Sequence, residues 1–190
     1  MNNPEEIEAK VRISNPAVFH SRMTGLAGEP DGPVLEVNCI FDSPDKRLKS
    51  AGSALRLREE FSLPGRDPRR TLLTFKGPRV PGPLKRRAEI ELEVEAAGPL
   101  VAILAELGMA EVFRYEKRRT TWRVADCEVV LDELPHLGWF AEVEGPTEEA
   151  VMRVLADVGL AGEPTIPSSY IHLLRDHLRG RGMDPGCAVF

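Results

Sequence analysis

Eight segments of the chain alternate apolar and charged residues with a period of two, and this alternation constrains the fold more than any other feature of the sequence. The segments are residues 5–13, 35–42, 54–61, 71–76, 87–94, 117–124, 127–133 and 140–144. Successive side chains of a strand point to opposite faces, so Ile7 and Val11 share one face while Glu8 and Lys10 share the other. The pattern predicts eight antiparallel strands, each with one apolar and one charged face.

Four helices are predicted among and after these strands, over residues 16–26, 99–107, 148–159 and 169–179. Asn15 and Pro16 give the first helix a capping residue and a proline in its first turn. Glu148 and Glu149 place acids in the first turn of the third helix, where the helix dipole favours them. We expect residues 1–180 to form a single domain and residues 181–190 to be a flexible tail.

The strand pattern is compatible with two arrangements of the sheet. In an ordinary antiparallel sheet the apolar face forms the core and the charged face meets water. A closed barrel with an apolar interior would need no helices to cover it, yet this chain has four, and residues 99–107 are almost entirely apolar. An inverted barrel would give the helices an apolar outer surface and leave a charged, water-filled interior. The pattern alone leaves both arrangements open.

Composition excludes several classes of protein. The chain is 42% hydrophobic and 29% charged, which is typical of a folded domain with many ionic side chains. A net charge of −5 argues against a broad nucleic-acid-binding surface. The longest nearly apolar stretch, residues 100–105, is far too short to span a membrane, and residues 1–6 do not resemble a secretory signal. Cys39, Cys127 and Cys187 lack metal-ligand spacing, and we expect buried free thiols in a cytoplasmic protein.

The sequence also lacks the motifs of several common enzyme classes. It contains no GxxxxGK[ST] phosphate loop and no GxSxG nucleophile elbow. The four histidines, His20, His136, His172 and His177, do not have the spacing of metal ligands. Nucleophilic catalysis by serine or cysteine and a histidine-based metal site are therefore not expected.

A series of short charged motifs runs along the strands in a distinctive order. The motifs are Glu6-Ile-Glu8-Ala-Lys10, Glu36-Val-Asn38 with Phe41-Asp42, Leu55-Arg56-Leu-Arg58, Phe75-Lys76-Gly-Pro78, Arg87-Ala-Glu89-Ile-Glu91, Lys117-Arg-Arg119, Leu131-Asp132-Glu133, Phe140-Ala-Glu142-Val-Glu144 and Ser169-Tyr170. Over residues 5 to 175 this series resembles the CYTH family, also called triphosphate tunnel metalloenzymes. That family includes class IV adenylyl cyclases, thiamine triphosphatases and inorganic triphosphatases.

The resemblance implies an α+β fold, in which an eight-stranded antiparallel closed β-barrel forms a triphosphate tunnel and helices pack on the outside. A triphosphate needs several cations presented together, and arginine holds phosphate oxygens in a planar fork. The expected phosphate ligands are Lys10, Arg56, Arg58, Lys76, Arg87, Lys117 and Arg119.

The resemblance also implies a cofactor, Mg²⁺ or Mn²⁺. These ions prefer oxygen donors and usually take one or two carboxylates, with water and phosphate oxygens completing the shell. The expected metal ligands are Glu6, Glu8, Asp132, Glu142 and Glu144, and the expected catalytic residues are Glu6, Glu8 and Lys10. Two carboxylates 4 Å apart repel by about 4 kcal/mol at an effective dielectric of 20, so the glutamate cluster should attract a cation.

Departures from the family patterns favour one activity. The His-Phe pair that precedes ExExK in the cyclases is missing, and Ala54 stands where thiamine triphosphatases place a stacking tryptophan. Ser168 and Ser169 stand where the family often has a late lysine. We expect metal-dependent hydrolysis of a small-molecule triphosphate, either tripolyphosphate or a nucleoside triphosphate. Class IV adenylyl cyclase activity and a non-catalytic polyphosphate- or nucleotide-binding module are the alternatives. The oligomeric state stays open, a homodimer included.

Overall fold

The computed structural model describes residues 5–82 and 84–190, with side chains from Ile7 onward at the N-terminal end. The strands are β1 (Glu5–Ile13), β2 (Asp31–Asp42), β3 (Ala54–Ser62), β4 (Asp67–Lys76), β5 (Lys85–Val94), β6 (Ala110–Val124), β7 (Cys127–Leu134), β8 (Gly138–Gly145) and β9 (Cys187–Ala188). The helices are α1 (Pro16–Ala27), α2 (Arg47–Ser50), α3 (Ala97–Glu106), α4 (Glu148–Asp157) and α5 (Tyr170–Gly180).

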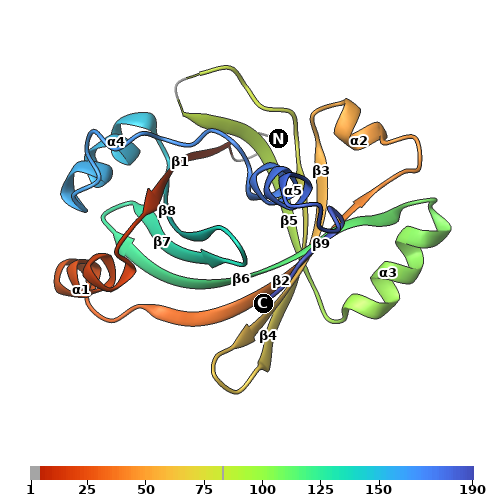
Figure 1. Cartoon of the computed structure of the whole chain (residues 1–190), viewed down its shortest axis with the longest axis horizontal. Coiled ribbons are helices and arrows are strands. Elements are labelled where there is room, and N and C mark those ends of the chain that lie inside the picture. Colours follow the sequence, from red (N-terminus) through yellow and green to blue (C-terminus); the bar gives the residue numbers. More distant parts are fainter. Residues whose placement is uncertain (1–4, 83) are drawn as a thin grey trace.

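The first eight strands close into an antiparallel barrel (Figure 1). Their spatial order is β2-β3-β4-β5-β1-β8-β7-β6, and pairing of β2 with β6 completes the ring. β9 adds a short parallel pairing to the outside of β6. The structure therefore confirms the predicted eight-stranded antiparallel barrel.

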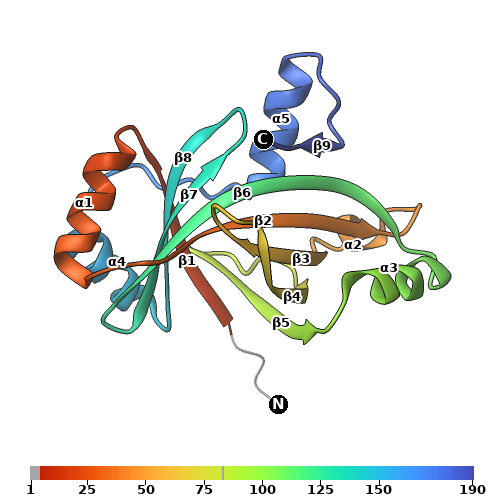
Figure 2. The same ribbon diagram turned by 90° about the horizontal axis from the view of Figure 1, so that it is seen from below.

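The barrel is inverted. On β1, Ile7, Ala9, Val11 and Ile13 are buried in a cluster that includes side chains of α1 and α4. Figure 2 shows these two helices together on one side of the barrel, with α3 on another side. A further apolar cluster lies between α3 and the outward side chains of β2 and β3. α1, α3 and α4 cover the apolar outer wall, and the charged faces point inward.

The inward faces become apolar at one end of the barrel, where α5 lies. Phe113 and Tyr115 share the face of Lys117 on β6, and Phe140 shares the face of Glu142 on β8. These aromatic side chains form a buried cluster with Tyr170, Leu174 and Leu178 of α5. α5 thus covers the inward-facing side chains at this end of the barrel, whereas α1, α3 and α4 pack on the outer wall.

β2 and β4 begin at Asp31 and Asp67, earlier than the sequence predicts, and three further differences concern β6, β5 and the C-terminus. β6 begins at Ala110 rather than residue 117, because pairing with β2 extends as far as Asp42. β5 begins at Lys85, because the strand pairs with β1 before its alternating pattern starts.

The third difference lies at the C-terminus, which the sequence predicts as a flexible tail. Cys187 and Ala188 of β9 pair with β6, Ala188 is buried, and the ring of Phe190 packs on the Arg118 guanidinium at 4.1 Å. Of the three cysteines, Cys39 and Cys127 are buried free thiols as expected, but Cys187 is exposed. No helix in the described ranges has both the length and the apolarity needed to span a membrane.

A charged tunnel as the candidate active site

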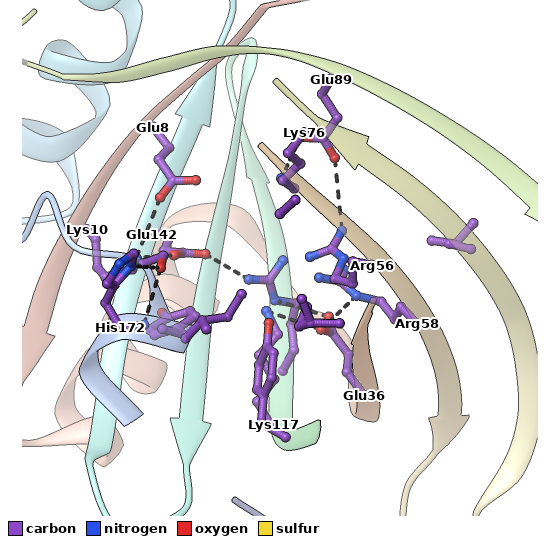
Figure 3. Close-up of a pocket in the computed structure, with 18 of the residues that line it drawn as sticks. Glu8, Lys10, Glu36, Arg56, Arg58, Lys76, Glu89, Lys117, Glu142 and His172 are labelled. Atoms are coloured by element: carbon purple, nitrogen blue, oxygen red, sulfur yellow. Dashed lines mark hydrogen bonds and ion pairs between the residues drawn. The ribbon is translucent and has the colours of Figure 1, made fainter. Parts of the chain in front are cut away.

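A cavity of about 1440 Å³ occupies the barrel, and its wall is strongly charged (Figure 3). The expected site residues on its wall are Glu8, Lys10, Arg56, Arg58, Lys76, Arg87, Lys117, Arg119, Glu142 and Glu144. The side chain of Glu6 lies outside the described part of the chain. Residues that are scattered over 137 positions of the sequence, from Glu8 to Glu144, therefore meet in one cavity.

Lys10 is held from two sides of the tunnel. It lies opposite Glu142 in the pairing of β1 with β8, and its Nζ is 3.1 Å from that carboxylate and 3.6 Å from Glu8. The same Nζ donates to the Ser168 carbonyl oxygen at 3.1 Å and lies 4.1 Å from the ring centre of Tyr170. Burial opposes the charge, but Glu142 and Glu8 outweigh it and raise the pKa of Lys10. Lys10 is therefore a fixed cation.

The Glu36 carboxylate forms ion pairs with three basic side chains in the tunnel. Its carboxylate lies 3.1 Å from Arg58, 3.2 Å from Lys117 and 3.4 Å from Arg119. Only 1% of its side chain is exposed. Burial alone would raise its pKa, but the three cations overcome that effect and lower it strongly. Glu36 is therefore ionised, and Figure 3 shows it beside Arg58 and Lys117.

Asp132 occupies a different position from that expected of a metal ligand. It is fully buried and does not line the cavity. Arg119 donates to its two oxygens at 2.7 Å each, and Lys117 donates to it at 3.2 Å. Burial works against the Arg119 charge, but Asp132 more than compensates and raises the pKa of Arg119 well above its usual value. Asp132 therefore holds Arg119 and Lys117 from a position outside the cavity wall.

Lys117 differs from Lys10 in the direction of its pKa shift. Burial and the neighbouring charge of Arg119 lower its pKa to about 8, although Asp132 and Glu36 act in the opposite direction. Its charge at neutral pH therefore depends on two buried carboxylates. A small rise in pH above this value would remove one positive charge from the centre of the site.

A second group of charges lines the opposite wall. Lys76 donates to Glu89, and Arg56 lies 4.0 Å from Glu89 and 3.8 Å from Glu91. Arg56 also donates to the hydroxyl of Thr74 at 3.2 Å. These side chains come from β3, β4 and β5, so paired cations line several sides of the cavity.

The glutamates expected to bind metal lie at adjacent positions of neighbouring strands. Glu8 is directly opposite Glu144 in the β1–β8 pairing, an arrangement in which like charges are unfavourable. In the structure the Lys85 ammonium lies 2.7 Å from Glu8, so a cation already offsets the expected repulsion. Glu142 holds both Lys10 and Arg119.

Among the described residues, the glutamates would need phosphate oxygens or water to complete a metal site. Within residues 5–82 and 84–190, no group of three or more acidic, histidine or cysteine side chains is placed to hold a metal. Mg²⁺ at phosphate sites commonly takes one or two carboxylates and obtains its remaining ligands from phosphate and water. The donor chemistry of Glu8 and Glu144 fits such a site.

Sequence reasoning missed three residues that line this cavity. Lys85 was outside the predicted strand, although its spacing of two from Arg87 would place it on the same face. Glu36 belongs to the Glu36-Val-Asn38 motif, but it was not among the expected ligands. Tyr170 belongs to the Ser169-Tyr170 motif, but its position beside Lys10 and Lys117 depends on how α5 packs.

The amino-acid sequence of this chain matches a known protein family. The CYTH domain family matches residues 4–152, which is most of the chain. The chain belongs to the CYTH family. CYTH proteins are enzymes that act as cyclases or triphosphatases and in general depend on a divalent metal.

Similar proteins span nearly the whole chain. The Methanocaldococcus jannaschii protein MJ0240, whose name proposes an adenylate cyclase, is 25% identical over 177 residues, which are 88% of this chain and 97% of that protein. The PH1819 protein of Pyrococcus horikoshii is 26% identical with a TM-score of 0.77, and the match covers 90% of this chain and 98% of PH1819. HpAC1 of Hippeastrum shares the fold at 20% identity and a TM-score of 0.61, over 90% of this chain and 95% of HpAC1.

Proposed function

We propose that this chain is a divalent-metal-dependent triphosphatase that hydrolyses tripolyphosphate or a nucleoside triphosphate. The observation that carries the proposal is the convergence of basic side chains from β1, β3, β4, β5 and β6 on one cavity. A triphosphate carries several negative charges along a short chain, and such a cavity supplies cations along its length. Glu8 and Glu144 on the same wall would repel a phosphate unless a metal ion were bound, which favours the enzyme over the non-catalytic alternative.

The protein's own part in the reaction is to position and neutralise the phosphates. Arg56, Arg58 and Arg119 would hold phosphate oxygens in planar forks, while Lys10 and Lys117 would add point charges. Their existing ion pairs fix the side chains before substrate arrives, which reduces the reorganisation needed during phosphoryl transfer.

Glu8 and Glu144, with Glu142 and the predicted ligand Glu6, would hold the metal. A bound Mg²⁺ or Mn²⁺ would supply further charge neutralisation at the phosphate oxygens. Triphosphate binding would draw Lys85 toward the phosphates and leave Glu8 available to the cation. Metal and substrate should therefore bind cooperatively.

Adenylyl cyclase activity is the second candidate, and the name of the M. jannaschii relative favours it. A cyclase must also hold the nucleoside so that the ribose hydroxyl attacks the first phosphorus. The aromatic side chains Tyr115 and Tyr170 on the cavity wall are already buried in the α5 cluster. HpAC1, a proposed adenylyl cyclase with the same fold, is described as having a dominant triphosphatase activity. These points favour hydrolysis.

The test is a product assay with tripolyphosphate, ATP and thiamine triphosphate, each with Mg²⁺ or Mn²⁺, in which phosphate and cyclic AMP are measured together. We expect metal-dependent phosphate release from tripolyphosphate at least as fast as from ATP, and loss of turnover in Glu8→Gln. The matched control is Glu133→Gln, which removes a carboxylate that pairs with the half-exposed Arg118. Stoichiometric cyclic AMP and pyrophosphate from ATP, with tripolyphosphate inert, would establish the cyclase instead.

A further inference from the structure

Glu36 forms ion pairs with Arg58, Lys117 and Arg119 at the same time. These cations come from two strands, β3 and β6, that flank β2 in the barrel. Glu36 is therefore the connection between the cations of one wall and those of the next. Asp132 supports only the two cations of β6.

The three cations would repel one another without this carboxylate. Two unit charges 4 Å apart interact by about 4 kcal/mol at an effective dielectric of 20, and here the charges are largely shielded from water. Burial and the charge of Arg56 already lower the pKa of Arg58. Removal of the Glu36 charge would increase the repulsion and allow the side chains to move apart.

Loss of Glu36 would have opposite effects on binding and on turnover. One negative charge fewer makes the tunnel more attractive to a polyanion, so ground-state binding should survive. Phosphoryl transfer depends on the exact placement of cations around the transferring group, and misplacement by about 1 Å can cost about 100-fold in rate. The rate should therefore suffer more than the affinity.

We infer that Glu36 is a positioning residue, which holds Arg58, Lys117 and Arg119 in the geometry that turnover requires without itself contacting the reacting atoms. This inference rests on the proposed triphosphatase activity. It adds a residue that neither the phosphate ligands nor the metal ligands include. In this assignment Glu8, Glu142 and Glu144 would bind the metal, whereas Glu36 would hold the basic side chains in place.

The experiment compares Glu36→Gln with Glu60→Gln. Glu60 lies directly opposite Glu36 in the β2–β3 pairing and is similarly buried, at 5% exposure. Its two oxygens accept hydrogen bonds from Arg70 at 2.8 and 3.2 Å, while its distance to Arg58 is 3.9 Å. The two variants therefore remove the same charge from neighbouring positions, but only Glu36 holds the three cations.

For tripolyphosphate, we expect kcat of Glu36→Gln to fall by roughly 30-fold or more, with KM changed by less than about fivefold. Glu60→Gln should stay within about threefold of the wild type in kcat, measured per folded protein. Glu36→Asp, which keeps the charge on a shorter side chain, should recover part of the rate. A kcat of Glu36→Gln within about threefold of wild type, or an equal loss in Glu60→Gln, would overturn the inference.

A binding measurement distinguishes this inference from the proposed function. If the wild type hydrolyses none of the triphosphates, the proposed function fails, and calorimetry with tripolyphosphate and pyrophosphate still tests Glu36. Cations in fixed positions should discriminate between the two chain lengths. We expect the ratio of their Kd values to narrow by about fivefold or more in Glu36→Gln and to stay constant in Glu60→Gln. An unchanged ratio in Glu36→Gln would reject the positioning role.

Discussion

Lys10 and Lys117 lie in the same tunnel, but their pKa values shift in opposite directions. Burial is costly for both ammonium groups, but the carboxylates around Lys10 raise its pKa. Lys117 has Arg119 beside it and lies within 5.6 Å of the Tyr170 ring centre, and its pKa falls to about 8. Lys10 therefore keeps its charge over the whole neutral and mildly alkaline range, while Lys117 loses its charge as the pH rises through 8.

The first prediction concerns the pH dependence of turnover. Because a base is protonated below its pKa, Lys117 should assist phosphate binding below pH 8 and stop doing so above it. We expect kcat/KM of the wild type to fall above pH 8. Lys117→Met should lower kcat/KM about 10-fold or more at pH 7 and abolish this inflection. Lys10→Met, the control, should reduce activity but retain the inflection. An inflection near pH 8 that persists in Lys117→Met would assign it to another group.

At the scale of single elements, the N-terminal end of α5 contacts the tunnel. Ser169 caps the helix, and Tyr170 at its first position reaches the Lys10 and Lys117 ammonium groups. Its ring also meets Phe140 edge to face, with centres 5.4 Å apart. The first turn of α5 thus contributes to the placement of two expected phosphate ligands.

The second prediction separates the ring of Tyr170 from its hydroxyl. Tyr170→Ala should destabilise the fold by about 3 kcal/mol, since it removes a buried aromatic ring, and should raise KM for tripolyphosphate because Lys10 and Lys117 lose a contact. Tyr170→Phe keeps the ring and should resemble the wild type in both respects. Denaturation and steady-state kinetics measure the two effects. Equal damage in both variants would show that the hydroxyl, rather than the ring, is what matters.

For the molecule as a whole, carboxylates join the inner faces of different strands. Glu36 links β2 to β3 and β6, and Glu142 links β8 to β1 and β6. Burial would raise the pKa of both groups, but the surrounding cations lower it from the usual value of 4.5. Protonation of these groups would leave buried cations without their partners in several strands at once.

The third prediction is a loss of stability in acid. Below pH 4.5 the unfolded chain takes up protons at these two positions while the folded protein does not, so the free energy of unfolding decreases as pH falls. Their contribution should be complete above pH 4.5 and decline below it. Urea denaturation between pH 7 and pH 3 measures the trend, and Glu36→Gln should weaken it. A wild-type stability that stays constant down to pH 3 would contradict this account.

The sequence by itself determined the eight barrel strands, the face of each side chain on its own strand and ten charged residues of the cavity wall. Residues two apart share a face, so Arg56 with Arg58 and Glu142 with Glu144 could be placed without a structure. The number of helices also favoured an inverted barrel, because apolar helices need an apolar surface to cover.

Only the tertiary structure decided which charges meet. The ion pairs of Glu36 with Lys117 and of Asp132 with Arg119 depend on strand register and on how the barrel closes, and periodicity within a strand carries neither. The same holds for Tyr170, which α5 carries to the tunnel from the far end of the chain. Local sequence fixes the direction of a side chain relative to its own strand, whereas its partners depend on contacts between strands that are distant in the sequence.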